Sequence, residues 1–169
     1  MKILTCFFIC LFTGFTGRAQ IDPTENDNLT ARESKVLLKQ AQKWLQSEDE
    51  EKIKAADEIF KELIKNAPKG EFDSDALNYA HGLARLKQEL SEESLKSLEK
   101  IKGFEDSFLR SQYRINKGKA QMDVAEKALE TKDFGKAKMS MQAAVDSFTN
   151  ALRENHKLDA ARNNLELSQ

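Results

Sequence analysis

The sequence predicts an all-α protein built from antiparallel helix pairs. Apolar residues recur at helical spacing from Thr30 to the end of the chain, and no stretch alternates at period two for long enough to suggest a sheet. Only two prolines interrupt the 169 residues. Charged residues make up 33% of the chain, a share typical of long helices with one solvated face.

The first residues are typical of a secretory signal peptide. Lys2 gives a short positive region, an apolar run extends from Ile3 to Phe15, and small residues precede a cut near Ala19–Gln20. A retained membrane anchor is the alternative, although the apolar run is short for a hydrocarbon core about 30 Å thick. We therefore expect a signal peptide over residues 1–19, a periplasmic or secreted mature chain, and no integral membrane segment after cleavage.

The mature chain has little net charge and few reactive side chains. Loss of Lys2 and Arg18 leaves 25 basic against 28 acidic residues, too balanced for a nucleic-acid-binding protein with a basic stripe. Both cysteines leave with the signal peptide, so no disulfide or thiolate ligand remains. His81 and His156 have no nearby carboxylate and no second ligand at metal spacing. We expect no catalytic residue, no metal site and no cofactor.

Short polar segments divide the remaining chain into about seven helices. Residues 20–29 form a polar leader, and Thr30 with Glu33 fits a capping box that begins the helical domain, residues 30–169. Later breaks are expected at residues 47–50, 68–70, 88–91, 102–103, 131–133 and 155–157. Short loops make neighbouring helices antiparallel. The expected pairs span about 30–67, 74–102 and 105–155, followed by a last helix over 158–168.

A row of small and large residues recurs in the second helix of each pair. The rows are Ala56–Phe60–Leu63, Ser94–Leu98–Ile101 and Ala144–Phe148–Ala151. In the first helix of the second pair, Gly82 stands twelve residues before Ser94. Small residues let two helix backbones approach, and the large residue fills the groove between them. The rows therefore predict where the helices of each pair touch.

This pattern resembles the tetratricopeptide (TPR) repeat, in which a small residue of the first helix stands twelve positions before that of the second. The resemblance covers residues 31–169 and implies a solenoid of helix pairs. The intervals depart from the family's period of about 34 residues: 38 residues separate Ala56 from Ser94, and 50 separate Ser94 from Ala144. An irregular helical bundle with the same periodicity is the alternative.

The third pair is predicted to be longer than a TPR pair. Gly118 and Ala144 are 26 residues apart instead of twelve, which adds one heptad to each helix. We therefore expect a hairpin stretched by about two turns, roughly 10 Å, with its turn at residues 131–134 and no break over 121–130. The last helix resembles a solenoid cap, and its DAARNNLEL segment looks like the closing segment of TPR proteins from aerotolerance (Bat-type) operons.

The TPR resemblance also implies a partner-binding surface. In that family, residues three before and one after the small position of each first helix point into a concave groove. Carried over to this chain, the groove residues are Leu38, Gln42, Tyr79, Leu83, Ile115, Lys119 and Asn163. This mixture suits an extended peptide or a partner helix. The alternative is that some of these side chains face helix–helix contacts.

These observations favour a non-enzymatic scaffold of the bacterial envelope that holds another envelope or secreted protein in the concave groove. The first alternative is a periplasmic holdase-type chaperone that uses the long hairpin as an arm. The second is a hydrolase whose carboxylate pair is assembled only by the fold. The sequence does not identify the partner.

Overall fold

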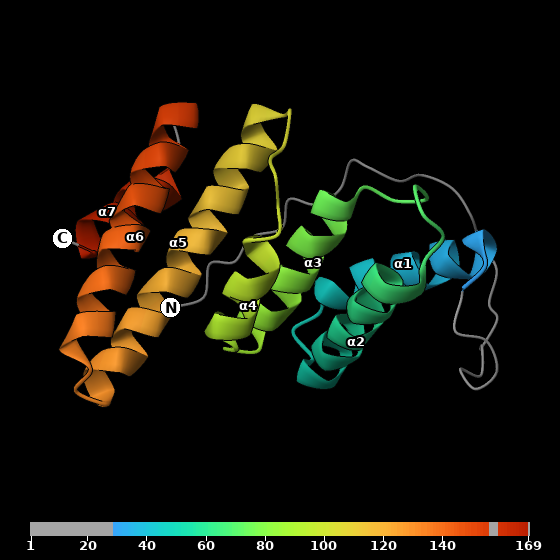
Figure 1. Cartoon of the computed structure of the whole chain (residues 1–169), viewed down its shortest axis with the longest axis horizontal. Helices are drawn as coiled ribbons and strands as arrows, with labels where there is room; N and C mark the ends of the chain where they lie inside the picture. Colours follow the sequence, from blue (N-terminus) through green and yellow to red (C-terminus); the bar gives the residue numbers. More distant parts are fainter. Residues whose placement is uncertain (1–28, 156–158, 169) are drawn as a thin grey trace.

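The computed structural model describes residues 29–155 and 159–168, and all regular secondary structure in these residues is helical (Figure 1). The helices are α1 (Ala31–Leu45), α2 (Glu50–Asn66), α3 (Ser74–Lys87), α4 (Ser91–Leu98), α5 (Ser107–Glu130), α6 (Phe134–Glu154) and α7 (Asp159–Leu167). The all-α prediction is confirmed for this part of the chain. The expected signal peptide, nearly all of the leader and His156 lie outside the described residues. No described helix is long and apolar enough to cross a membrane.

Most of the helices begin after a polar residue whose side chain accepts a hydrogen bond from a backbone N–H group of the first turn. Thr30 and Glu33 form the predicted capping box, in which Thr30 Oγ1 accepts from the Glu33 N–H at 3.3 Å and Glu33 Oε2 accepts from the Thr30 N–H at 2.9 Å. Aspartate carboxylates cap four later helices, at Asp49, Asp73, Asp106 and Asp133. Short polar breaks therefore become helix starts.

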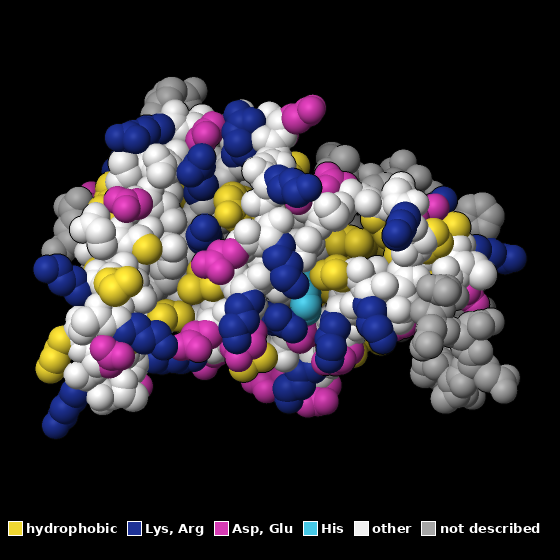
Figure 2. All heavy atoms as spheres, in the orientation of Figure 1, with side chains coloured by type: hydrophobic (Ala, Val, Ile, Leu, Met, Phe, Trp, Pro, Cys, Tyr) yellow, Lys and Arg dark blue, Asp and Glu magenta, His cyan; other side chains and the backbone are white. Residues whose placement is uncertain are grey.

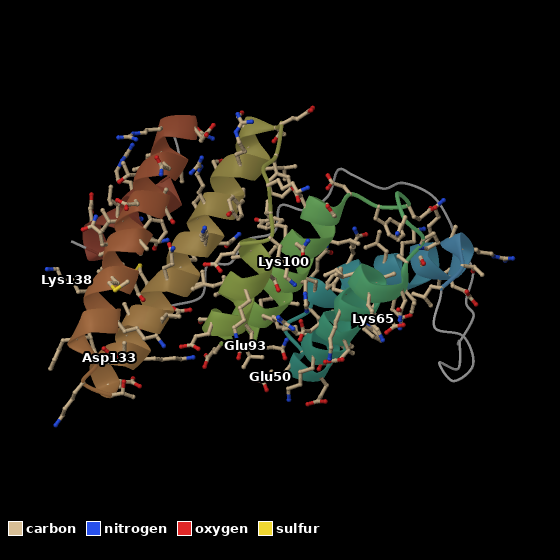
Figure 3. All side chains as sticks on the ribbon, viewed as in Figure 1. Glu50, Lys65, Glu93, Lys100, Asp133 and Lys138 are labelled. Atoms are coloured by element: carbon tan, nitrogen blue, oxygen red, sulfur yellow. The ribbon has the colours of Figure 1, made fainter. Side chains whose placement is uncertain are left out.

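The helix pairs form a row across the molecule, with α1 and α2 at one end and α6 and α7 at the other (Figure 1). Each helix packs against the next one along the chain, and contacts also join α1 to α3, α3 to α5 and α5 to α7. Figure 3 shows Glu50, Glu93 and Asp133 along one edge of this row, at or near the starts of α2, α4 and α6. The second helix of each pair therefore begins at the same edge.

Three clusters of buried side chains follow one another along the row. The first joins α1, α2 and α3 around Phe60, and the second joins α3 and α4 around Leu98. The third joins α5, α6 and α7 around Phe148. Phe60, Leu98 and Phe148 are the large members of the three predicted rows, and each has 0% exposure. The prediction that these rows lie at helix contacts is confirmed.

Two glycines show how closely the paired helices approach. A Cβ added at Gly82 would lie 2.7 Å from Leu98 Cδ2, and one added at Gly118 would lie 2.6 Å from Phe148 Cε1. Ser94 Oγ also donates a hydrogen bond to the Gly82 carbonyl at 2.8 Å, which ties α4 to α3 at this point. A larger side chain at either glycine would have to displace a buried partner.

The turns of the second and third pairs have the same geometry. Each contains one non-glycine residue with φ of 61°, Glu89 after α3 and Lys132 after α5. In both turns, that residue and the next donate to carbonyls of the preceding helix in a Schellman arrangement. The turn after α5 lies at residues 131–133, and α5 continues unbroken through 121–130, as predicted.

Measured from these turns, the third pair is longer by one heptad in each helix. Gly82 lies seven residues before Glu89, whereas Gly118 lies fourteen before Lys132. On the far side of the turn, Leu98 follows after nine residues and Phe148 after sixteen. Because seven residues make about two helical turns, the long pair keeps the same contact geometry at a greater distance from its turn.

The second pair differs from the prediction at its end. Helix α4 stops at Leu98, although the pair was expected to continue to residue 102. The following segment is held by Asp75 of α3, whose Oδ2 accepts from the N–H groups of Lys102 and Gly103, both at 3.0 Å. These bonds to a side chain replace the helical hydrogen bonds that the segment would otherwise make.

Candidate functional site

Three of the predicted groove residues are buried and are not presented to a partner in this structure. Leu38 has 8% exposure and packs in the first cluster, while Tyr79 and Ile115 have 3% each and pack in the other two. Tyr79 also accepts a hydrogen bond from Asn116 Nδ2 at 2.8 Å, and burial raises its pKa. These three residues lie on the faces of their helices that pack against neighbouring helices.

The other four predicted groove residues are accessible. Gln42 on α1, Leu83 on α3 and Lys119 on α5 are partly exposed, and Asn163 on α7 is exposed. These four helices are the ones that touch in the order α1, α3, α5 and α7. We name these four residues the first-helix surface. Whether they bind a partner stays a prediction.

Lys119 is the most distinctive member of this surface. Burial lowers the pKa of its ammonium group, and the charge of Asp123 one turn later opposes that shift. Asp123 itself accepts a hydrogen bond from Ser91 Oγ at 3.0 Å. No carboxylate of the described residues lies within ion-pair distance of Lys119 Nζ. A partly desolvated ammonium gains more from a carboxylate than a fully exposed one does.

A buried polar cluster joins α2, α3 and α4, and the sequence did not reveal it. His81 Nε2 lies 3.1 Å from Asp57 Oδ1. Arg85 Nε donates to the same oxygen at 3.3 Å. Ser97 Oγ lies 3.3 Å from His81 Nδ1. The expectation that His81 has no nearby carboxylate is therefore wrong, because the fold brings in Asp57 from 24 residues earlier.

The electrostatics of this cluster favour a charged Asp57. Burial by itself raises the pKa of the Asp57 carboxyl, but the neighbouring His81 and Arg85 more than offset burial, and the net pKa lies below its usual value. Serine, histidine and aspartate are also the groups of a hydrolytic triad. Here, however, Ser97 is 1% exposed and His81 is 6% exposed, so no substrate reaches the hydroxyl group in this structure. The cluster joins three helices.

A cavity of about 500 Å³ opens between the end of α2, the α2–α3 loop and the start of α3. Its apolar wall includes Leu63, Phe72 and Leu77. Lys65 and Lys69 also line it, and Figure 3 marks Lys65 on α2. We name this feature the α2–α3 cavity. It lies on different residues from the first-helix surface.

Exposed apolar side chains gather where α5 and α6 meet. Leu129, Phe134 and Met139 are 49%, 68% and 75% exposed. Figure 2 shows hydrophobic side chains at this end of the molecule, at the lower left. The same end is attached to the preceding pair, because Lys127 Nζ donates to the Glu89 carbonyl at 2.6 Å and Lys136 Nζ lies 2.5 Å from Glu92 Oε1. The long pair is therefore anchored on one side and exposed on the other.

Comparison with known proteins adds no assignment. No family model matches the chain, and no curated protein or solved structure is detectably similar to it. The function must be argued from the structure. Within residues 29–155 and 159–168, no group of three or more histidine, cysteine, aspartate or glutamate side chains is placed to hold a metal ion.

Proposed function

We propose that the protein is an exported interaction scaffold of TPR-like helix pairs that binds another envelope or secreted protein without catalysing a reaction. The observation that carries the proposal is the repetition of one packing rule. A glycine of the first helix meets a large buried side chain of the second in both the α3–α4 and α5–α6 pairs, and both pairs use the same turn. Repeated helix pairs of this kind build extended surfaces, which proteins use for binding.

The contacts between first helices support a solenoid-like order. Helices α1, α3, α5 and α7 touch in sequence, and the accessible members of the first-helix surface come from these four helices. Leu83 offers apolar area, while Gln42 and Asn163 offer amide groups. Lys119 adds a partly buried positive charge. An extended segment with apolar and acidic residues fits this combination.

A crosslinking pull-down from the cell envelope tests this proposal. Leu83→Glu and Lys119→Gln should each reduce recovery of a specific partner, because the first places a charge against the bound segment and the second removes its ionic contact. Lys54→Gln is the matched control, since Lys54 is an exposed lysine of α2 that pairs with Glu51. Equal recovery with all three variants, or no specific partner at all, would refute the proposal.

A holdase-type chaperone is the second candidate function. The exposed side chains of Leu129, Phe134 and Met139 favour it, because exposed apolar groups bind unfolded chains. A chaperone should suppress the light scattering of an aggregating, denatured client at near-stoichiometric amounts. The double variant Phe134→Ser/Met139→Ser should lose that effect while Gln142→Ser keeps it. No suppression by the unaltered protein would remove this candidate.

A further inference from the structure

We propose that the α2–α3 cavity is a second binding site, which takes an apolar side chain from an acidic segment of a partner protein. The proposed site shares no residue with the first-helix surface and does not depend on it. Three properties of the cavity carry the proposal: its apolar wall, one buried acceptor without a partner, and a rim that carries only positive charge.

The size and wall of the cavity suit one apolar side chain. A volume of about 500 Å³ lies within the range of about 300–1,000 Å³ for small-ligand sites. Leu63 and Leu77 are buried, with 1% and 7% exposure, and line the cavity. Ile64, at 37% exposure, and Phe72 add apolar surface that a bound side chain would cover. Covering it would be favourable in proportion to its area.

Asn78 supplies a hydrogen-bond acceptor that the fold leaves unused. Its Nδ2 donates to the Ser74 carbonyl at 2.8 Å, which fixes the orientation of the amide, since the reverse orientation would place two acceptors against each other. Its Oδ1 has no hydrogen-bond partner, although the residue is only 8% exposed. A buried acceptor without a donor costs free energy. Because Asn78 Oδ1 is itself covered, a backbone N–H of a bound segment would satisfy it only once the side chains around it move aside.

The charges around the cavity select an acidic occupant. Lys65 and Lys69 line it, no acidic residue does, and neither lysine has an ion-pair partner among the described residues. Carboxylates on either side of the apolar anchor would meet these groups. A basic or neutral segment would lack this complementarity.

Titration with short peptides, followed by NMR, tests the site in the purified protein. The probe is the amidated peptide acetyl-Glu-Asp-Phe-Asp-Glu. We expect it to shift the side-chain amide signals of Asn78 and the methyl signals of Leu63 and Leu77. The double variant Lys65→Gln/Lys69→Gln should bind the probe roughly fivefold more weakly than the unaltered protein. Asn78→Ala should weaken binding of the probe by a similar factor. Lys61→Gln is the matched control, because Lys61 is an exposed α2 lysine that pairs with Glu58 and does not line the cavity.

Further peptides separate the contributions and give the results that would overturn the proposal. Replacing the probe's phenylalanine with alanine should abolish the methyl shifts, and replacing its acids with lysines should abolish binding. Equal binding of the acidic and basic peptides would overturn the proposal, as would an absence of shifts at these three residues at millimolar probe. The variant Asp22→Asn/Glu25→Asn/Asp27→Asn tests the chain's own acidic leader. If it binds the probe tenfold more tightly than the unaltered chain, the leader is the occupant, and a site for an outside partner is refuted.

Discussion

Replacement of Gly118 by alanine tests the packing of the long pair. Alanine favours a helix over glycine by about 1 kcal/mol, so the change would stabilise an unconstrained helix. Its new Cβ, however, would lie 2.6, 2.8 and 2.9 Å from Cε1, Cζ and Cδ1 of Phe148. The Phe148 ring has 0% exposure and cannot move into solvent. Overpacking of this kind costs about 1–3 kcal/mol, so we expect a net loss of roughly 1 kcal/mol.

Thermal unfolding followed by circular dichroism measures this loss, which should lower Tm by roughly 3 °C. Gly135→Ala in α6 is the matched control, because its Cβ would find only Asp133 Oδ1 at an ordinary 3.6 Å. That variant should be as stable as the unaltered protein or more stable. Phe148→Leu should partly rescue Gly118→Ala by making room for the new methyl group. The packing argument fails if Gly118→Ala raises Tm as much as Gly135→Ala does.

Three further predictions follow from single contacts. Ser94→Ala removes the hydrogen bond to the Gly82 carbonyl and should lower the free energy of unfolding by about 1 kcal/mol, measured with urea; an unchanged value would mean that the bond adds nothing. The pKa of Asp57 is lowered in the folded protein, so its contribution is present above the unfolded pKa of about 4 and is lost as pH falls through the folded value. Between pH 5 and pH 2, the free energy of unfolding should therefore fall less for Asp57→Asn than for the unaltered protein. An equal fall would contradict this assignment. Phe134→Ser should change Tm by no more than about 1–2 °C, because the side chain is 68% exposed; a larger drop would show that the ring is packed.

Most of the fold could be predicted from the sequence because the signals are local. Spacing of small and large residues located Leu98 and Phe148, since close helix packing admits only certain side chains at the contact. The boundaries between helices could be predicted because polar segments supply the capping side chains that helix ends need. The early end of α4 was missed because it depends on Asp75, a side chain from another helix that bonds the backbone of residues 102 and 103.

Less of the candidate site could be predicted. The groove positions carried over from the TPR pattern include Leu38, Tyr79 and Ile115, which the fold buries. Spacing places a residue on a face of its helix but does not say how closely the next helix covers that face. The Asp57–His81 contact and the α2–α3 cavity depend on how separate helices meet, and neither leaves a spacing signal in the chain.

The central claim is that the long pair repeats the contact of the shorter pair in one defined register, with Gly118 against Phe148. Nuclear Overhauser effects in the purified protein test it most directly. We predict strong contacts between the Gly118 α-protons and the Phe148 ring, and the equivalent contacts between Gly82 and Leu98. A Phe148 ring that contacts Ala125 and not Gly118 would contradict the claim, because the two helices would then pair in a different register.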